Sequence, residues 1–353
     1  MKRLPIRDAR IKLFLLSLMH LATDGLCAYL MFEKLYPENP ERSFLVFIGY
    51  NFLAFLTQSP LGIWIDKHNH PHRFLGISVV AILLGFAFRD LGQLAVLLIG
   101  LGNAFFHIAG GKYVTDKSGN DISHLGIFVS TGAIGLTLGQ SYRMINGLAL
   151  IFFGLLIGCS LILWLSEDAE NKTYAEKYTA KGSGATAALL AVTAVVLARS
   201  FVGKVASADF ELTQPLLLLI ALATALGKAF GGIVSRWIGT VPTVIASMSV
   251  AAVCLTAGCA NPYAYLLGVF AFNFSMPITL YYANILLKGK EGFAFGTLAA
   301  ALIPGYLLAM IFHDSVWINI VTVALCFGSV LVIAIIAKGI HHADRTVASD
   351  SLD

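Results

Sequence analysis

Apolar residues fill long runs of this chain, and polar residues are confined to short breaks between the runs. The hydrocarbon core of a bilayer, about 30 Å thick, is crossed by a helix of roughly 20 apolar residues. By that measure the sequence predicts twelve membrane-spanning helices, at 11–33, 44–65, 73–89, 91–112, 122–142, 145–166, 184–203, 212–235, 238–260, 262–287, 292–312 and 315–338. The pattern therefore predicts an all-α integral membrane fold.

A polar stretch divides these helices into two groups of six. The sequence EDAENKTYAEKYTAKGSG (167–184) is charged and ends in Gly-Ser-Gly, as is typical of a linker. The ends of the second and eighth helices also share a pattern, whose residues are Gly62, Asp66 and Lys67 in one and Gly231, Ser235 and Arg236 in the other. We therefore predict two six-helix bundles, 1–166 and 184–353, joined by a linker at 167–183, which is a recurrent transporter plan.

Composition supports the membrane assignment. The 353 residues are 58% hydrophobic and 12% charged, whereas charged residues make up about 25% of a soluble domain. Most Lys and Arg residues fall on the same side as the basic N-terminus MKRLPIRDARIK, and short loops rich in these residues stay in the cytoplasm. We expect a multi-pass protein of the cell (inner or plasma) membrane, with both termini, the linker and a short C-terminal tail in the cytoplasm.

Two pairs of polar residues interrupt the apolar runs. His20 and Asp24 lie four residues apart in the first predicted helix, and Asn103 and His107 have the same spacing in the fourth. Residues four apart share a helix face. Ionisable groups within a membrane are costly and mark ion or substrate pathways, which favours a functional role over the alternative, a hydrogen bond that only packs the bundle.

Two chemistries fit the first of these pairs. Asp24, with His20, is suited to proton coupling, because burial moves the pKa of a carboxyl group and that of a histidine toward each other. His20, Asp24 and His107 are also a suitable ligand set for a divalent metal ion or a metal chelate. The spacing alone does not choose between protons and a metal.

Further polar residues within the predicted helices are candidates for contact with a solute. Together with the second pair, the predicted solute-binding residues are His107, Asn103, Lys228, Tyr50, Asn51 and Asn273. Arg199 is expected near an outer end, with its side chain extended to the membrane surface. Pro277 and Pro304 predict bends in the tenth and eleventh helices, which suit a cavity between helices.

The repeated pattern at the helix ends predicts a gate. Asp66 and Lys67 are expected at the cytoplasmic edge, where a carboxylate can cap a neighbouring helix and pair with a basic residue, and Gly62 allows close approach. Arg236 occupies the matching place in the second half. The alternative is a solvated charged loop without a gating role.

Several function classes are excluded. We find no phosphate-binding loop, no nucleotide motif and no nucleophile constellation, so neither an enzyme nor a cofactor is expected. The five cysteines lie singly in apolar runs, as small buried hydrophobes do. The expected partners are the lipid bilayer, protons and a small-molecule or ion substrate, without nucleic acid, and the expected state is a monomer.

Four stretches carry a resemblance to a known family. HLATDG in the first helix, TQSPLGIWIDK in the second, GLGNAFFH in the fourth and FVSTGAIGLTLGQ in the fifth resemble the fosmidomycin-resistance-type exporters of the major facilitator superfamily. In the second half, only GKAFGGIVSRWIG and GKEGFAFG (289–296) resemble the pattern. The resemblance implies an ion-coupled carrier that works by rocker-switch alternating access.

The resemblance also implies roles for individual residues. It makes Asp24 and His107 the coupling or substrate residues, and Asp66 and Lys67 the gate. Antiporters of this superfamily usually have a proline after Gly139, where this chain has Gln140. The proline that usually follows the residue matching His107 is likewise replaced by Ile108. The first departure weakens the case for drug/proton antiport.

The sequence thus predicts a secondary active transporter that exports a small polar solute, coupled to protons, by alternating access. The alternative is a transporter of a divalent metal ion or metal chelate that uses His20, Asp24 and His107. A third possibility is a non-transporting sensor with a carrier-like fold, in which the polar pairs would be structural.

Overall fold

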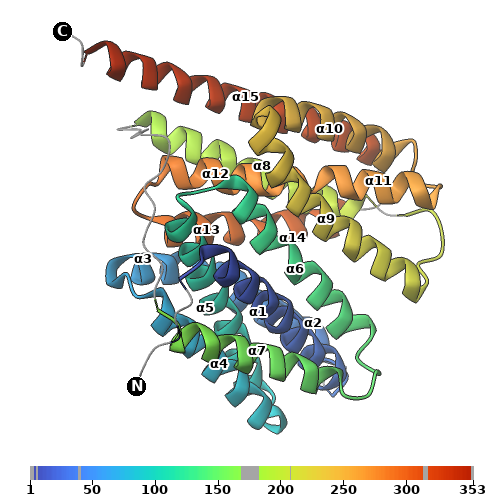
Figure 1. Ribbon diagram of the computed structural model, residues 1–353. Coiled ribbons are helices and arrows are strands. Elements are labelled where there is room, and N and C mark those ends of the chain that lie inside the picture. The colour runs from blue at the N-terminus through green and yellow to red at the C-terminus, as the bar shows by residue number, and fades with distance from the viewer. Residues whose placement is uncertain are drawn as a thin grey trace.

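The computed structural model describes residues 4, 7–38, 41–167, 183–206, 208–312 and 317–350, and almost all of them lie in helices (Figure 1). Within these ranges there is no β-strand, only an isolated bridge between Leu4 and Ser166. The predicted linker, 167–183, lies outside the described residues except at its two ends, so the division of the chain there stays a prediction.

The helices of the first half follow the predicted order. They are α1 (Ala9–Leu30) with the π-helical turn η1 (Met31–Leu35), α2 (Ser43–Asn51) with the π-helical turn η2 (Phe52–Leu56), α3 (Gln58–His68), α4 (Pro71–Ala87), the short turn η3 (Arg89–Leu91), α5 (Gln93–Ser118), α6 (Ile122–Ser141) and α7 (Leu148–Leu165). The second predicted span is thus built from α2, η2 and α3.

The second half contains the remaining helices. They are α8 (Ser183–Val205), α9 (Gln214–Ile238), α10 (Thr240–Thr256), α11 (Pro262–Phe272), α12 (Ser275–Leu286), α13 (Glu291–Ala300), α14 (Leu302–Phe312) and α15 (Ile318–Asp350). The ends of α3 and α15 both lie at the left of Figure 1. We name this the α3/α13 end, because α13 begins beside α3.

The spans agree with the hydropathy pattern. Within the described residues, ten segments are long and apolar enough to cross a membrane, and α4 and α10 are shorter apolar helices. Each of these two has 17 residues, which at 1.5 Å per residue covers about 25 Å. Together they match the twelve predicted spans, so the all-α integral membrane fold is confirmed. The helix α15 continues to Asp350, beyond the predicted end of the last span at 338.

Both predicted bends are present. The tenth span breaks between α11 and α12, just before Pro277, and the eleventh breaks at Ala301, just before Pro304. Proline has no N–H to donate to the carbonyl four residues earlier, so the helix ladder loses a bond at each site. The π-helical turn η2 was not predicted, and such turns occur frequently at functional sites.

Small residues allow the two halves to approach closely. The helix α6 packs against α1 on one side and against α9 on the other, while α3 and α5 pack against α13. A Cβ atom on Gly62 would collide with the backbone carbonyl of Gly292, and one on Gly126 would lie 2.6 Å from the carbonyl oxygen of Lys228. Gly62 and Gly126 therefore lie where the backbones of the two halves are in direct contact.

Candidate solute cavity and its polar cluster

A cavity of about 510 Å³ lies between helices of both halves. It extends from the middle of α1 and α5 to Phe32, Phe47 and Gln140, which lie toward the end opposite the α3/α13 end. All eight residues predicted for proton coupling and solute binding line this one cavity: His20, Asp24, Tyr50, Asn51, Asn103, His107, Lys228 and Asn273.

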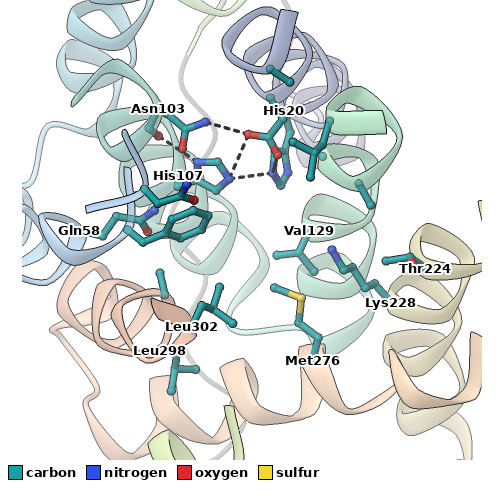
Figure 2. A pocket seen from close by; sticks show the side chains of 18 of the residues that line it. His20, Gln58, Asn103, His107, Val129, Thr224, Lys228, Met276, Leu298 and Leu302 are labelled. Atoms are coloured by element: carbon teal, nitrogen blue, oxygen red, sulfur yellow. Dashed lines mark hydrogen bonds and ion pairs between the residues drawn. The ribbon is translucent and has the colours of Figure 1, made fainter. Parts of the chain in front are cut away.

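Four of these residues form a polar cluster, defined here as His20, Asp24, Asn103 and His107. The Nε2 atoms of His20 and His107 lie 3.0 Å apart. The carboxylate of Asp24 lies 3.3 Å from His20 Nε2 and 3.7 Å from His107 Nε2, and it accepts a hydrogen bond of 2.9 Å from the amide of Asn103. The dashed lines in Figure 2 join these groups between α1 and α5.

The other ring nitrogens fix the tautomers. His20 Nδ1 lies 2.7 Å from the carbonyl oxygen of Phe128, and His107 Nδ1 lies 2.9 Å from that of Asn103. A carbonyl oxygen only accepts, so each Nδ1 must carry the hydrogen; this assignment rests on the hydrogen-bond network. In neutral rings both Nε2 atoms are then acceptors facing each other beside a carboxylate. Such an arrangement is repulsive unless a cation, either a proton or a metal ion, lies between them.

Two cationic side chains reach the cavity from the second half. Lys228 projects from α9, as Figure 2 shows, and Arg199 lines the cavity from α8. The expected extension of Arg199 to the membrane surface is wrong, because its Nη1 atom is buried and has no hydrogen-bond partner. Arg199 was not predicted as a cavity group, because depth along a helix does not reveal which neighbour a side chain faces.

The remaining predicted solute contacts lie at irregular points of the helices. Asn273 ends α11 and donates to the carbonyl of Val269 at 2.9 Å, while Asn51 lies just before η2 and donates to Phe47 at 2.8 Å. Gln58, which the sequence reasoning did not select, also lines the cavity and is fully buried. Its Oε1 atom has no hydrogen-bond partner within the described part of the chain.

The predicted gate residues lie at the α3/α13 end. Asp66 accepts hydrogen bonds from the backbone N–H groups of Gly292 and Phe293, at 2.9 and 2.8 Å, at the start of α13. A carboxylate at a helix N-terminus interacts favourably with its free N–H groups and dipole. Asp66 therefore joins the two halves as expected for a contact of this kind.

The basic partner of Asp66 is a lysine that was not among the predicted gate residues. Lys67 is exposed, and no hydrogen bond or ion pair involves it among the described residues. Instead Lys112 of α5 is buried, with its Nζ atom 3.5 Å from Asp66, 3.3 Å from Asp116 and 3.1 Å from Glu291. The sequence could not identify Lys112 as this partner, because helices distant in sequence bring it to the carboxylates.

Arg236 makes a second contact between the halves. Its Nη1 atom lies 2.9 Å from Asp121, which caps the start of α6 and accepts from the N–H of Ser123. Partial burial raises the pKa of Asp121, but its contacts with His124 and Ser123 outweigh burial and hold the pKa well below its usual value. Asp121 is therefore ionised at neutral pH and pairs with the arginine.

Comparisons with known proteins identify the fold. No protein-family model matches this sequence, and no curated protein matches it either. Among solved structures, it is similar to the E. coli fucose:proton symporter FucP, with a TM-score of 0.67, 14% identity, and coverage of 95% of this chain and 99% of that one. FucP in the outward conformation is similarly close, with a TM-score of 0.68 and 13% identity over 94% of this chain and 99% of that one.

Two further structures share this arrangement of helices. The human organic anion transporter MFSD10 aligns with a TM-score of 0.63 and 13% identity over 93% of this chain and 99% of that one. A bacterial homologue of the iron transporter ferroportin, in an outward-facing state, aligns with a TM-score of 0.61 and 15% identity over 94% and 100%. The chain therefore has the fold of the major facilitator superfamily transporters.

Proposed function

We propose that this protein is a proton-coupled secondary transporter that exports a small polar solute through the central cavity by alternating access. The observation that carries the proposal is the meeting of His20 Nε2 and His107 Nε2 at 3.0 Å beside Asp24. Both Nδ1 atoms donate to backbone carbonyls, so the facing Nε2 lone pairs repel each other when no cation lies between the rings, which supports a site for a proton there. The export direction rests on the resemblance of the first half to fosmidomycin-resistance-type exporters.

Alternating access is supported by where the halves touch. Asp66, Lys112 and Arg236 link them at the α3/α13 end, while the cavity extends to Gln140 toward the other end. At the opposite end the halves are joined by exposed hydrogen bonds, from Tyr142 to the carbonyl of Gln214 and from the Gln214 amide to the carbonyl of Ser141. Ion pairs between the halves at one end, with a cavity that extends toward the other, are consistent with one state of a rocking carrier. One of the structural neighbours is a fucose:proton symporter, which makes proton coupling consistent with the fold.

A divalent metal ion is the second candidate. The two Nε2 atoms lie 3.0 Å apart, and Asp24 lies 3.3 Å from His20 through Oδ2 and 3.7 Å from His107 through Oδ1. The ligands of a tetrahedral zinc site lie about 3.3 Å apart at the usual bond lengths. Metal-bound histidines typically donate their other N–H to a carbonyl, as both do here. Lys228 and Arg199 argue against a metal, because two cations lining the same cavity repel a dication.

The test is flux into liposomes that contain the purified protein. A pH gradient is imposed, and internal pH is followed while anionic, neutral and zwitterionic solutes are added one at a time; Zn²⁺ and Mn²⁺ uptake is measured in parallel. We expect solute-dependent proton flux that Asp24→Asn abolishes. The control Asp90→Asn, at an exposed carboxylate away from the cavity, should leave flux unchanged.

The other outcomes separate the alternatives. Zn²⁺ or Mn²⁺ uptake that both Asp24→Asn and His107→Gln abolish, without proton movement, would replace the proposal by the metal candidate. Absence of flux for every solute and metal would contradict a transporter and favour a sensor of carrier-like fold.

A further inference from the structure

We infer that the cavity binds an organic anion, a carboxylate with an apolar body, and that Arg199 and Lys228 hold its charged group. This inference rests on the proposed function and names its substrate class. It starts from two cationic side chains, from α8 and α9, that line one cavity. Within the described part of the chain, neither forms a hydrogen bond or an ion pair, and the Nη1 atom of Arg199 is buried without a partner.

Among the described residues, the one acid that lines this cavity does not neutralise them. Asp24 belongs to the polar cluster, where Asn103 and both histidines surround its carboxylate. Lys228 interacts electrostatically with Asp24 but lies beyond ion-pair distance from it, and it also experiences the like charge of Arg199. Whether the two histidines are neutral or share one proton, the cavity therefore has an excess of positive charge.

An unpaired charge away from bulk water is costly, and natural sites satisfy such charges with counter-ions. A neutral solute would leave both cations unpaired. A dication would add to the positive charge. An anion that reaches both side chains would form charge-assisted hydrogen bonds, and the guanidinium group matches the two oxygens of a carboxylate.

The rest of the lining indicates what the anion carries. Phe32, Phe47, Phe55, Phe295 and Met276 line the cavity together with these polar groups. Aromatic side chains and methionine favour an apolar body of adaptable shape. The volume of about 510 Å³ lies within the range of sites for small organic ligands. A small aromatic carboxylate fits these features better than an inorganic anion.

The experiment is calorimetric binding to the purified protein with two matched probes, phenylacetate and phenylacetamide, which differ in charge but hardly in shape. We expect phenylacetate to bind at least about tenfold more tightly than the amide. Arg199→Gln and Lys228→Gln should each weaken phenylacetate binding by about tenfold or more, and Arg199→Lys should retain part of it. Decanoate, run in parallel, distinguishes a water-soluble acid from a lipid-derived one.

A matched control exists on the same helix. Lys204 ends α8, is exposed and lies over the ring of Tyr306, so Lys204→Gln removes a positive charge outside the cavity. It should leave phenylacetate binding unchanged. Equal binding of the amide and the acid, or an equal effect of Lys204→Gln, would overturn the inference. Lys228→Gln keeps the test decisive if Arg199→Gln does not fold.

Failure of this inference is distinguishable from failure of the proposed function. Proton-driven flux of a neutral solute such as fucose, unaffected by Arg199→Gln and Lys228→Gln, would support the proposed transport function and contradict the inferred anion site. Tight anion binding that both variants weaken, without any flux in liposomes, would support the inferred anion site and contradict the proposed transport function.

Discussion

The imidazole rings of His20 and His107 meet edge to face, with their Nε2 atoms 3.0 Å apart, although 87 positions separate them in the sequence. Each ring is fixed by a backbone carbonyl at its Nδ1 atom. The two nitrogens that face each other are therefore the ones free to share a cation. Asp24 supplies the negative charge that stabilises it.

This geometry predicts the protonation pattern of both rings. In ¹⁵N-labelled protein at neutral pH and without added metal, NMR should show both Nδ1 atoms protonated and a single proton shared between the Nε2 atoms. The reason is that neither carbonyl can donate and one proton relieves the repulsion between two lone pairs. An unprotonated Nδ1 on either ring would contradict the arrangement, and His68, exposed at the end of α3, provides a reference spectrum.

A second prediction concerns Gly132, which faces the polar cluster from α6. A Cβ atom here would collide with both the Asp24 carboxylate and His20 Nε2. Gly132→Ala should therefore displace the cluster and reduce solute-dependent proton flux at least about tenfold, as loss of geometry by 1 Å typically does. The control is Gly154→Ala in α7, where a Cβ atom has open space. Equal flux in both variants would show that the cluster is not involved.

The two pairs that form the polar cluster could be predicted because the members of each pair lie close together in the sequence. A spacing of four residues places His20 with Asp24, and Asn103 with His107, on one helix face each, whatever the rest of the chain does. The twelve spans follow in the same way from the length of apolar runs. That the two pairs face each other depends on the packing of α1 against α5, which the sequence reasoning only assumed.

What could not be predicted depends on contacts between distant helices. In the sequence, Arg199 cannot be distinguished from a lysine or arginine whose side chain extends to the membrane surface. Only the packing of the helices shows that its side chain lines the cavity. Lys112 and Lys67 are both near a predicted membrane edge, but only Lys112 lies beside Asp66 and Glu291. No local spacing distinguishes these two lysines.

The difference between the two lysines can be measured. Lys112→Gln removes the buried cation that three carboxylates share, and it should lower the free energy of unfolding by about 3 kcal/mol. Lys67→Gln alters an exposed side chain and should change it by less than about 0.5 kcal/mol. Denaturant unfolding of both variants in the same detergent provides the comparison. Similar losses in the two would mean that the buried ion pairs of Lys112 contribute no more to stability than the exposed side chain of Lys67.

The last prediction follows from the lowered pKa of Asp121, which joins α6 to Arg236 of α9. A carboxyl group with a lower pKa in the folded than in the unfolded protein stabilises the fold above its unfolded pKa, about 3.9 for aspartate. That contribution declines as the pH falls below about 4 toward the folded pKa. The melting temperature of Asp121→Asn should therefore lie below that of the natural protein at pH 7, and the difference should begin to narrow as the pH is lowered from 4 to 3. Arg236→Gln should also be less stable at pH 7, because it removes the cation that pairs with the ionised carboxylate. A constant difference between the natural protein and Asp121→Asn across this pH range would mean that the charge of Asp121 does not contribute to stability, because the Asn oxygen can still accept the hydrogen bonds from Ser123.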